Sequence, residues 1–162
     1  MIDASPPSLV PTPIGLGPKY RPPALVRDGR TLGPLRCTRG GARYGVHLEL
    51  FAHGRVVIVP RGIGVARGCS YDARTRTPTG VIEVRRGAKL KLGDVFRIWG
   101  RPLGRFRLVG FKSAKPLLAF VAGRRWRGDP RDIPLAYHAQ IVLELDGYVP
   151  PHPTFLFPGG LR

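Results

Sequence analysis

The stretch that most constrains the fold is Thr77–Gly100, where the hydrophobic pattern changes from that of a strand to that of a helix. Residues 81–84 predict a short strand, and the apolar side chains that follow recur at one-turn spacing, as in an amphipathic helix. Asp94 falls in the first turn, where the helix dipole favours an acid, and Gly100 is a stop signal. We expect the helix to bury one face against a sheet. That face consists of Leu92, Val95, Phe96 and Trp99.

The rest of the chain has the pattern of strands and turns. The clearest hairpin runs from Val46 to Pro60, with His53-Gly54 as its tight turn, because both residues accept a positive φ. The return strand Val56–Val59 is apolar on both faces, so we expect it at the centre of a sheet. Further strands are expected at Phe106–Phe111, Leu117–Val121, Arg124–Arg127 and Gln140–Leu145.

This order of elements predicts an α+β fold: a mixed, mainly antiparallel twisted sheet with one short helix packed on it, in a β-grasp-like layout. A small β-sandwich with an incidental helix is the alternative. Prolines concentrate at both ends, so we expect a Pro-rich extended arm at 1–35, one β-rich domain at 36–148 and a Pro- and aromatic-rich tail at 149–162 that docks on the domain. The arm either lies along the domain through Leu16, Tyr20 and Leu25 or is a mobile tail.

The chain is strongly basic, with 27 Lys and Arg against 10 Asp and Glu and a formal charge of +17. It contains no run of about 20 apolar residues, so we expect no membrane-spanning helix. The start, Met1-Ile2-Asp3, is acidic and lacks the apolar segment of a signal peptide. The chain is therefore either cytoplasmic or a mature form from which a leader has been removed.

Five pieces of the sequence resemble, in the same order, a family of uncharacterised bacterial envelope proteins that are mostly secreted or lipid-anchored. The pieces cover about residues 36–160 and are VHLELFAHGRVVIVPRGIGV, RTRTPTGVIEV, KLGDVFRIWG, GDPRDIPLAYHAQIVLEL and YVPPHPTFLFPGG. The resemblance implies a shared fold and an extracytoplasmic location, and it implies no reaction.

The chain departs from this family at its His-rich motifs. Typical members have a pattern like H-x-H-x-H-L and later H-T-H-D-x-x-G-x-I-H-V-E, which would suit a divalent transition metal. Here the first motif keeps only His47, and the second has become Arg74-Thr75-Arg76-Thr77 with Glu83-Val84-Arg85. Arginine stays protonated and does not ligate metals, so we expect no metal site and interpret His47 as an exposed strand residue.

Two cysteines, Cys37 and Cys69, flank the first hairpin, whose return would bring them together. We expect a disulfide in an oxidising compartment and two free thiols in a cytoplasm. The chain has no C-x-x-C motif, which argues against thiol catalysis and a structural zinc site.

The sequence contains no recognisable catalytic constellation. Neither G-x-S-x-G nor H-E-x-x-H is present, and no nucleophile is placed beside His138 or His152. The glycines of Arg61–Cys69 have the wrong spacing for a phosphate loop, and no helix follows them. We therefore expect a non-catalytic protein without a cofactor.

The basic excess suggests a polyanion-binding face. Arg124-Arg125-Trp126-Arg127 alternates cations with an aromatic ring, a combination suited to phosphate contact and stacking. The other candidate residues are Arg74, Arg76, Arg85, Arg86, Arg97, Arg101, Arg105 and Arg107. The alternative interpretation is a solvated Arg-rich surface from a biased genome, with Trp126 covering the core.

Two functional hypotheses follow. The first is a non-catalytic extracytoplasmic domain that binds or scaffolds a component of the cell envelope. The second is a charge-driven module that binds nucleic acid, anionic lipid or another polyanion without sequence preference. The sequence names neither the ligand nor the oligomeric state.

Overall fold

Eight strands form one mixed sheet in the part of the chain that the computed structural model describes, residues 17–161. The remaining strands make a three-stranded sheet and a two-stranded hairpin, and together they form a single small domain. In chain order the elements are β1 (Lys19–Tyr20), β2 (Arg43–Ala52), β3 (Arg55–Val57), β4 (Val65–Ala66), β5 (Cys69–Ser70), β6 (Ala73–Arg74), β7 (Val81–Arg85), α1 (Leu92–Trp99), β8 (Leu103–Gly104), β9 (Arg107–Leu108), β10 (Phe111–Lys112), β11 (Leu118–Val121), β12 (Arg124–Trp126), the 3-10 turn η1 (Pro130–Asp132), β13 (Gln140–Leu145) and the 3-10 turn η2 (Gly159–Leu161).

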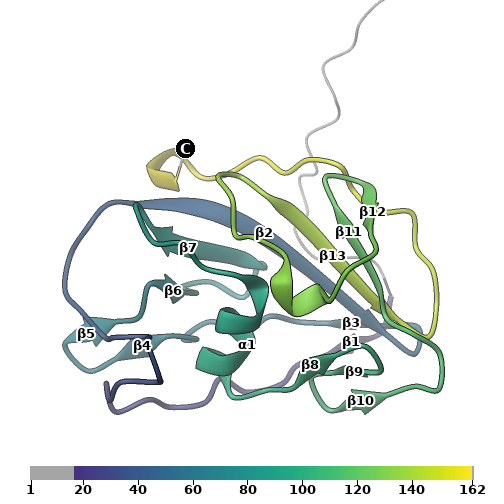
Figure 1. Ribbon diagram of the computed structural model, residues 1–162, viewed down its shortest axis with the longest axis horizontal. Coiled ribbons are helices and arrows are strands. Elements are labelled where there is room, and N and C mark those ends of the chain that lie inside the picture. Colours follow the sequence, from purple (N-terminus) through teal and green to yellow (C-terminus); the bar gives the residue numbers. More distant parts are fainter. Residues whose placement is uncertain (1–16, 162) are drawn as a thin grey trace, which may run out of the picture.

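The centre of the main sheet is the parallel pair β2 and β13, in register from His47 opposite Gln140 to Ala52 opposite Leu145. The strand order is β1-β3-β2-β13-β11-β12, and β7 pairs with the first half of β2 and with β6 (Figure 1). Apart from β2–β13, only the short pair β1–β3 is parallel within the described sheet. The predicted mixed, mainly antiparallel sheet with one short helix is confirmed, and the fold class is α+β.

The first hairpin has the predicted turn. His53 and Gly54 have φ values of 50° and 73°, as a tight hairpin requires. The position predicted for the return strand is wrong: β3 is not central, because only β1 lies beyond it. The other side of β2 is taken by β13 from the far end of the chain, a non-local pairing that the local pattern does not encode.

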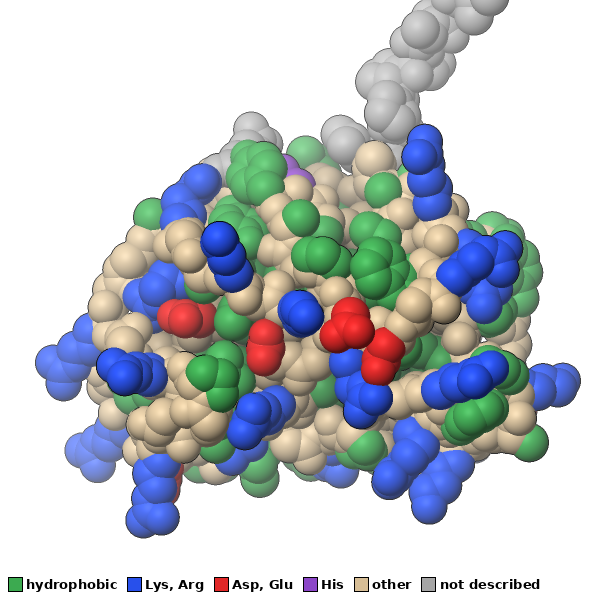
Figure 2. All heavy atoms as spheres, in the orientation of Figure 1, with side chains coloured by type: hydrophobic (Ala, Val, Ile, Leu, Met, Phe, Trp, Pro, Cys, Tyr) green, Lys and Arg blue, Asp and Glu red, His purple; other side chains and the backbone are tan. Residues whose placement is uncertain are grey.

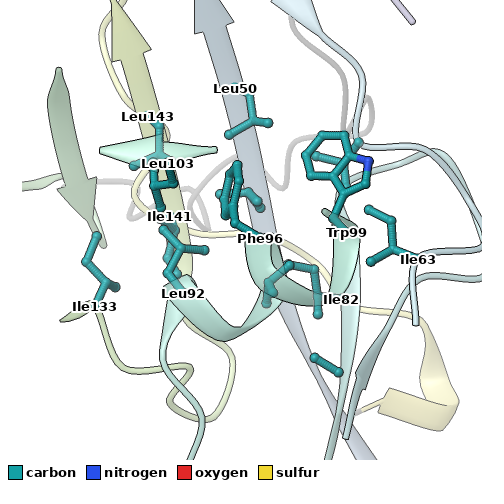
Figure 3. Close-up of a cluster of buried hydrophobic side chains, with 14 of the residues drawn as sticks. Leu50, Ile63, Ile82, Leu92, Phe96, Trp99, Leu103, Ile133, Ile141 and Leu143 are labelled. Atoms are coloured by element: carbon teal, nitrogen blue, oxygen red, sulfur yellow. The ribbon is translucent and has the colours of Figure 1, made fainter. Parts of the chain in front are cut away.

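Helix α1 covers one face of the sheet, as predicted. It begins where the backbone N–H of Lys91 donates to the Asp94 carboxylate over 2.8 Å, and it ends at Gly100, which has a φ of 75°. Both are common forms of helix capping, in which backbone groups at the helix ends find hydrogen-bond partners. Phe96 points from α1 toward Leu50 of β2, and Trp99 lies beside Ile63 (Figure 3); all four residues belong to the buried core. The expected apolar face is buried, with Trp99 only 1% exposed.

The single strand predicted at Phe106–Phe111 is wrong. The chain instead forms the short antiparallel strands β9 and β10, which join β8 in a small separate sheet. They are separated by a turn in which buried Val109 has a φ of 58°, a conformation that a β-branched residue rarely adopts. The local sequence therefore did not indicate this turn.

The N-terminal segment is tied to the domain from residue 17 onward. The indole N–H of Trp99 donates to the carbonyl of Pro23 over 3.2 Å, and the Arg27 guanidinium donates to the carbonyls of Arg97 and Ile98. Arg27 thus satisfies groups at the C-terminal end of α1. Residues 1–16, including the expected contact of Leu16, lie outside the described part.

Cys37 and Cys69 form a disulfide with their Cα atoms 5.4 Å apart, as predicted for an oxidising compartment. The backbones of Thr38 and Ser70 exchange two hydrogen bonds of 2.9 and 2.8 Å beside it. The disulfide therefore joins the segment before β2 to the β4–β5 hairpin. In residues 17–161 no helix has the length and apolar character needed to cross a membrane.

The C-terminal tail runs along the side of the sheet away from α1, drawn in yellow in Figure 1. Phe157 is 3% exposed and packs on Gly45 and Val81, while Phe155 stacks on His47 with ring centroids 3.7 Å apart. The tail thus covers a face of the sheet that carries polar side chains.

Candidate polyanion-binding site

An open groove of about 620 Å³ lies beside β12, the edge strand of the main sheet. Its lining residues come from the end of β12 and the turn into η1, from the start of β11 and from Arg105. The groove is lined by Arg105, Pro116, Leu117, Ala119, Arg125, Trp126, Arg127, Gly128, Asp129, Pro130 and Arg131.

Trp126 lines this groove, and its ring is held in place. It pairs with Ala119 across β11 and β12 and packs against the core, so it is only partly exposed. Its indole N–H donates to the carbonyl of Asp129 over 3.0 Å. The residue therefore covers the core, as the alternative interpretation requires, and also offers a fixed aromatic surface to the groove.

The groove carries an excess of positive charge. Arg131 donates to both carboxylate oxygens of Asp129, at 2.7–3.1 Å, and this bonding lowers the pKa of the exposed Asp129 side chain. Asp129 is the only acid in the lining, and its charge is paired with that of Arg131. Within residues 17–161, Arg105, Arg125 and Arg127 form no ion pair, and their charges are available to a ligand.

The structure brings together only some of the predicted basic residues. Arg105, Arg125, Trp126 and Arg127 line the groove, whereas Arg97, Arg101, Arg107 and Arg124 do not. Figure 2 shows Lys and Arg scattered over one face of the molecule, at its margin and in its middle, with Asp and Glu in a row across the middle. The charge is therefore widely spread on this face, and the groove is distinguished by its shape and its tryptophan.

A second set of predicted arginines lies at the opposite end of the sheet, around β6 and β7 (Figure 1). The Arg74 and Arg76 side chains both donate to the buried Glu83 carboxylate, at 3.0 and 2.6 Å. Arg85 donates to Asp72 at 2.8 Å. Arg86 instead lies over the ring of Tyr137, 5.8 Å from its centroid. The first three arginines thus have carboxylate partners inside the protein.

The positions compared with the His-rich motif at residues 74–85 thus form ion pairs: Arg74 and Arg76 pair with Glu83, and Arg85 pairs with Asp72. In residues 17–161 no group of three or more His, Cys, Asp and Glu side chains is arranged to hold a metal ion.

The interpretation of His47 as an exposed residue is wrong. Its side chain is fully buried under Phe155, and its ring nitrogens lie 2.7 Å from Gln140 Oε1 and 3.0 Å from the carbonyl of Thr79. Both partners present oxygen atoms to the ring, and the Glu49 carboxylate lies 3.7 Å from His47 Nδ1. The reason is the tail, whose covering of this face the alternating pattern of β2 did not predict.

The polar network continues from His47 to the tail. The Gln140 amide donates to Glu49 Oε1 over 3.1 Å, and His152 Nδ1 lies 2.9 Å from the same oxygen. Glu144 accepts from the backbone N–H of Val149, while its Oε2 is buried with no hydrogen-bond partner. Burial raises the pKa of Glu144 to about 7, and nearby Glu49 adds to the effect.

The sequence analysis missed three arginines that the structure places in pockets: Arg131 in the groove, and Arg39 and Arg43 near the disulfide. For Arg43 the available signal was its spacing: it lies two and four residues before Gly45 and His47 and therefore shares one face of β2 with them. Comparison with protein-family models, curated proteins and solved structures found no match. Inference about function therefore starts from the geometry of this chain.

Proposed function

We propose that this protein is a non-catalytic domain that binds an anionic polymer of the cell envelope in the groove beside β12. One observation carries the proposal: a fixed indole lies in a groove of about 620 Å³ whose Arg105, Arg125 and Arg127 have no ion pairs within the described residues. An aromatic surface stacks on rings of a polymer, and guanidinium groups bind carboxylates or phosphates in the bidentate manner.

The extracytoplasmic location is part of the proposal. A disulfide is more common in oxidising compartments than in a cytoplasm, and the Cys37–Cys69 bond supports such a location. The resemblance to envelope proteins points the same way. We also propose a β-grasp-like layout, which is supported by the central parallel pair β2–β13 flanked by the antiparallel partners β3 and β11.

The proposal is tested by measuring binding of the purified, oxidised protein to polygalacturonate over a salt series. The variant Arg125→Gln/Arg127→Gln removes two charges from the groove. Its matched control, Arg21→Gln/Arg55→Gln, removes two exposed charges that do not line it. We expect binding that weakens with salt, a loss of about tenfold or more in the groove variant because each charged hydrogen bond contributes roughly 1.5–3 kcal/mol, and a much smaller loss in the control.

Trp126 separates a shaped site from diffuse attraction. Trp126→Leu keeps every charge but removes the flat ring, so binding in the groove should weaken by about 1–3 kcal/mol, the range measured for aromatic stacking on bases. Equal losses in the groove variant and its control, with no effect of Trp126→Leu, would contradict the proposal.

A single-stranded DNA oligonucleotide and vesicles rich in phosphatidylglycerol serve as the other ligands. Tighter binding of DNA than of polygalacturonate, with the same dependence on Trp126, would favour the alternative of a nucleic-acid-binding module. No binding to any of the three at low salt would leave the charge without a ligand.

A further inference from the structure

A second, smaller pocket of about 330 Å³ lies beside the disulfide, at the end of the sheet away from the groove. Its lining includes Cys69 and the small residues of the β4–β5 hairpin. The side chains that bring hydrogen-bond donors to it are Thr38, Arg39, Arg43, Ser70 and Arg74. It shares no lining residue with the groove.

Arg43 is the unusual member of this pocket because it is a cation that is only 7% exposed. Its Nη1 donates to the carbonyls of Asp72 and Glu83, and its Nη2 donates to the carbonyl of Tyr71, over 2.8–3.2 Å. No carboxylate pairs with it in residues 17–161. Its Nε–H and one N–H of Nη2 have no acceptor among the described residues, and these two donors form one edge of the guanidinium, suited to a bidentate oxyanion.

The surroundings of Arg43 compensate its charge only in part, through the nearby Glu83 and Asp72. Burial lowers the pKa of Arg43 to about 10, and repulsion from Arg74 and Arg85 adds to the effect. The nearby carboxylates are already engaged, since Glu83 accepts from two arginines and Asp72 from Arg85. Arg39 adds a further exposed cation and is anchored by its Nε–H to the carbonyl of Gly68 over 2.8 Å.

Ser70 completes the set of donors. Its buried hydroxyl accepts from Arg74 Nη1 over 3.0 Å, so its own proton is left to donate, and it has no acceptor within residues 17–161. A ligand here would meet cations and donors and no carboxylate in the pocket lining.

We propose that this pocket binds a single tetrahedral oxyanion of the phosphate or sulfate class, held by Arg43, Arg39 and Ser70. The site is independent of the groove and differs from it in kind. The groove offers an aromatic surface to an extended polymer, whereas this pocket offers convergent donors and no ring. The oxyanion is either the free ion or the terminal phosphate of a phosphomonoester, which presents the same oxygens.

The test uses the full oxidised chain, with calorimetric titration of inorganic phosphate, sulfate and glycerol 3-phosphate against chloride at matched ionic strength. Phosphate or sulfate should bind with one-to-one stoichiometry and raise the melting temperature in a saturable way, because a ligand of the native state stabilises it. Tighter binding of glycerol 3-phosphate than of free phosphate would identify a phosphomonoester as the ligand class. A melting temperature that follows ionic strength alone would overturn the proposal.

Variants of Arg39 and Ser70 are used in place of Arg43, since Arg43 satisfies three carbonyls and its replacement risks unfolding the protein. Arg39→Gln and Ser70→Ala should each weaken phosphate binding by about tenfold or more. The control Arg67→Gln removes an exposed charge from the turn between β4 and β5. Arg67 does not line the pocket, so this variant should change binding by less than about twofold. Equal losses for Arg39→Gln and Arg67→Gln would overturn the site in favour of diffuse charge. Arg125→Gln in the groove should leave phosphate binding unchanged.

Discussion

The two faces of the central strands are both buried, but by different chemistry. Toward α1, β2 presents Val46, Leu48 and Leu50, which are packed among apolar side chains. Toward the tail, the same strand presents His47 and Glu49, which are buried in a hydrogen-bonded network. One face is stabilised by transfer of apolar area from water. On the other face most buried polar groups have partners, which limits the cost of burial, and Glu144 Oε2 is the exception.

This difference shows how a short irregular tail can cover a sheet. Phe155 and Phe157 supply apolar area, and His152 and the N–H of Val149 supply partners for Glu49 and Glu144. An apolar face accepts many packing partners, but the polar face requires particular donors and acceptors. We infer that the tail has one register on this face, set by its hydrogen bonds.

The largest predicted effect concerns the apolar face. Trp99→Ala removes a fully buried side chain of the helix and should lower the free energy of unfolding by about 3–5 kcal/mol. Urea denaturation followed by circular dichroism measures the loss. A change below about 1 kcal/mol would show that α1 does not anchor the core.

The second prediction concerns the polar face through pH. Because the folded-state pKa of Glu144 is about 7 and its ordinary value is 4.5, the native state holds a proton that the unfolded state has released between these values. The contribution of Glu144 to stability is therefore present below pH 4.5 and is lost as the pH rises toward 7. At about 1.4 kcal/mol per pKa unit, the loss is roughly 3–4 kcal/mol.

Glu144→Gln removes this titration, so the variant should gain stability relative to the parent as the pH is raised from 5 to 8. Parallel urea titrations of both proteins at several pH values measure the difference, in which the other titrating groups cancel. An identical pH dependence of the two proteins would mean that Glu144 is ionised normally in the folded state.

The smallest predicted effect concerns the apolar anchors of the tail. Phe157→Ala should cost about 2 kcal/mol, the range for burying a phenyl ring, whereas the control Leu156→Ala changes a neighbour that is 46% exposed and should cost under about 0.5 kcal/mol. A Cβ at Gly45 would lie 2.2 Å from the Phe157 ring. Gly45→Ala should therefore destabilise the parent more than it destabilises the Phe157→Ala background, and strictly additive losses would argue against this packing.

The elements that local signals define were predictable from the sequence. The helix with its stop at Gly100, the His53-Gly54 turn and the strand Gln140–Leu145 follow from spacing and residue type within short segments. The Cys37–Cys69 bond joins residues 32 positions apart and was expected because the two cysteines flank the first hairpin. For the candidate groove, the run of Arg and Trp at residues 124–127 identified three of the lining residues, Arg125, Trp126 and Arg127.

The features that the sequence did not predict depend on contacts between distant segments. The burial of His47 depends on Phe155, and the position of β3 depends on β13 taking the other side of β2. Arg105 was among the predicted candidates, but its place in one groove with Arg125 and Arg127 depends on how the chain folds between them. A single sequence carries periodicity and turn chemistry, but it does not state which strand pairs with which.

The parallel pairing of β2 with β13 also has a consequence for how the chain folds. These strands are separated by most of the domain, so the loop between them must close before the centre of the sheet forms. Contacts of such long range slow folding. During synthesis β2 emerges well before its central partner, and its edge remains open until the last strand has left the ribosome. We therefore expect this protein to fold late and to depend on protection of that edge in the interval.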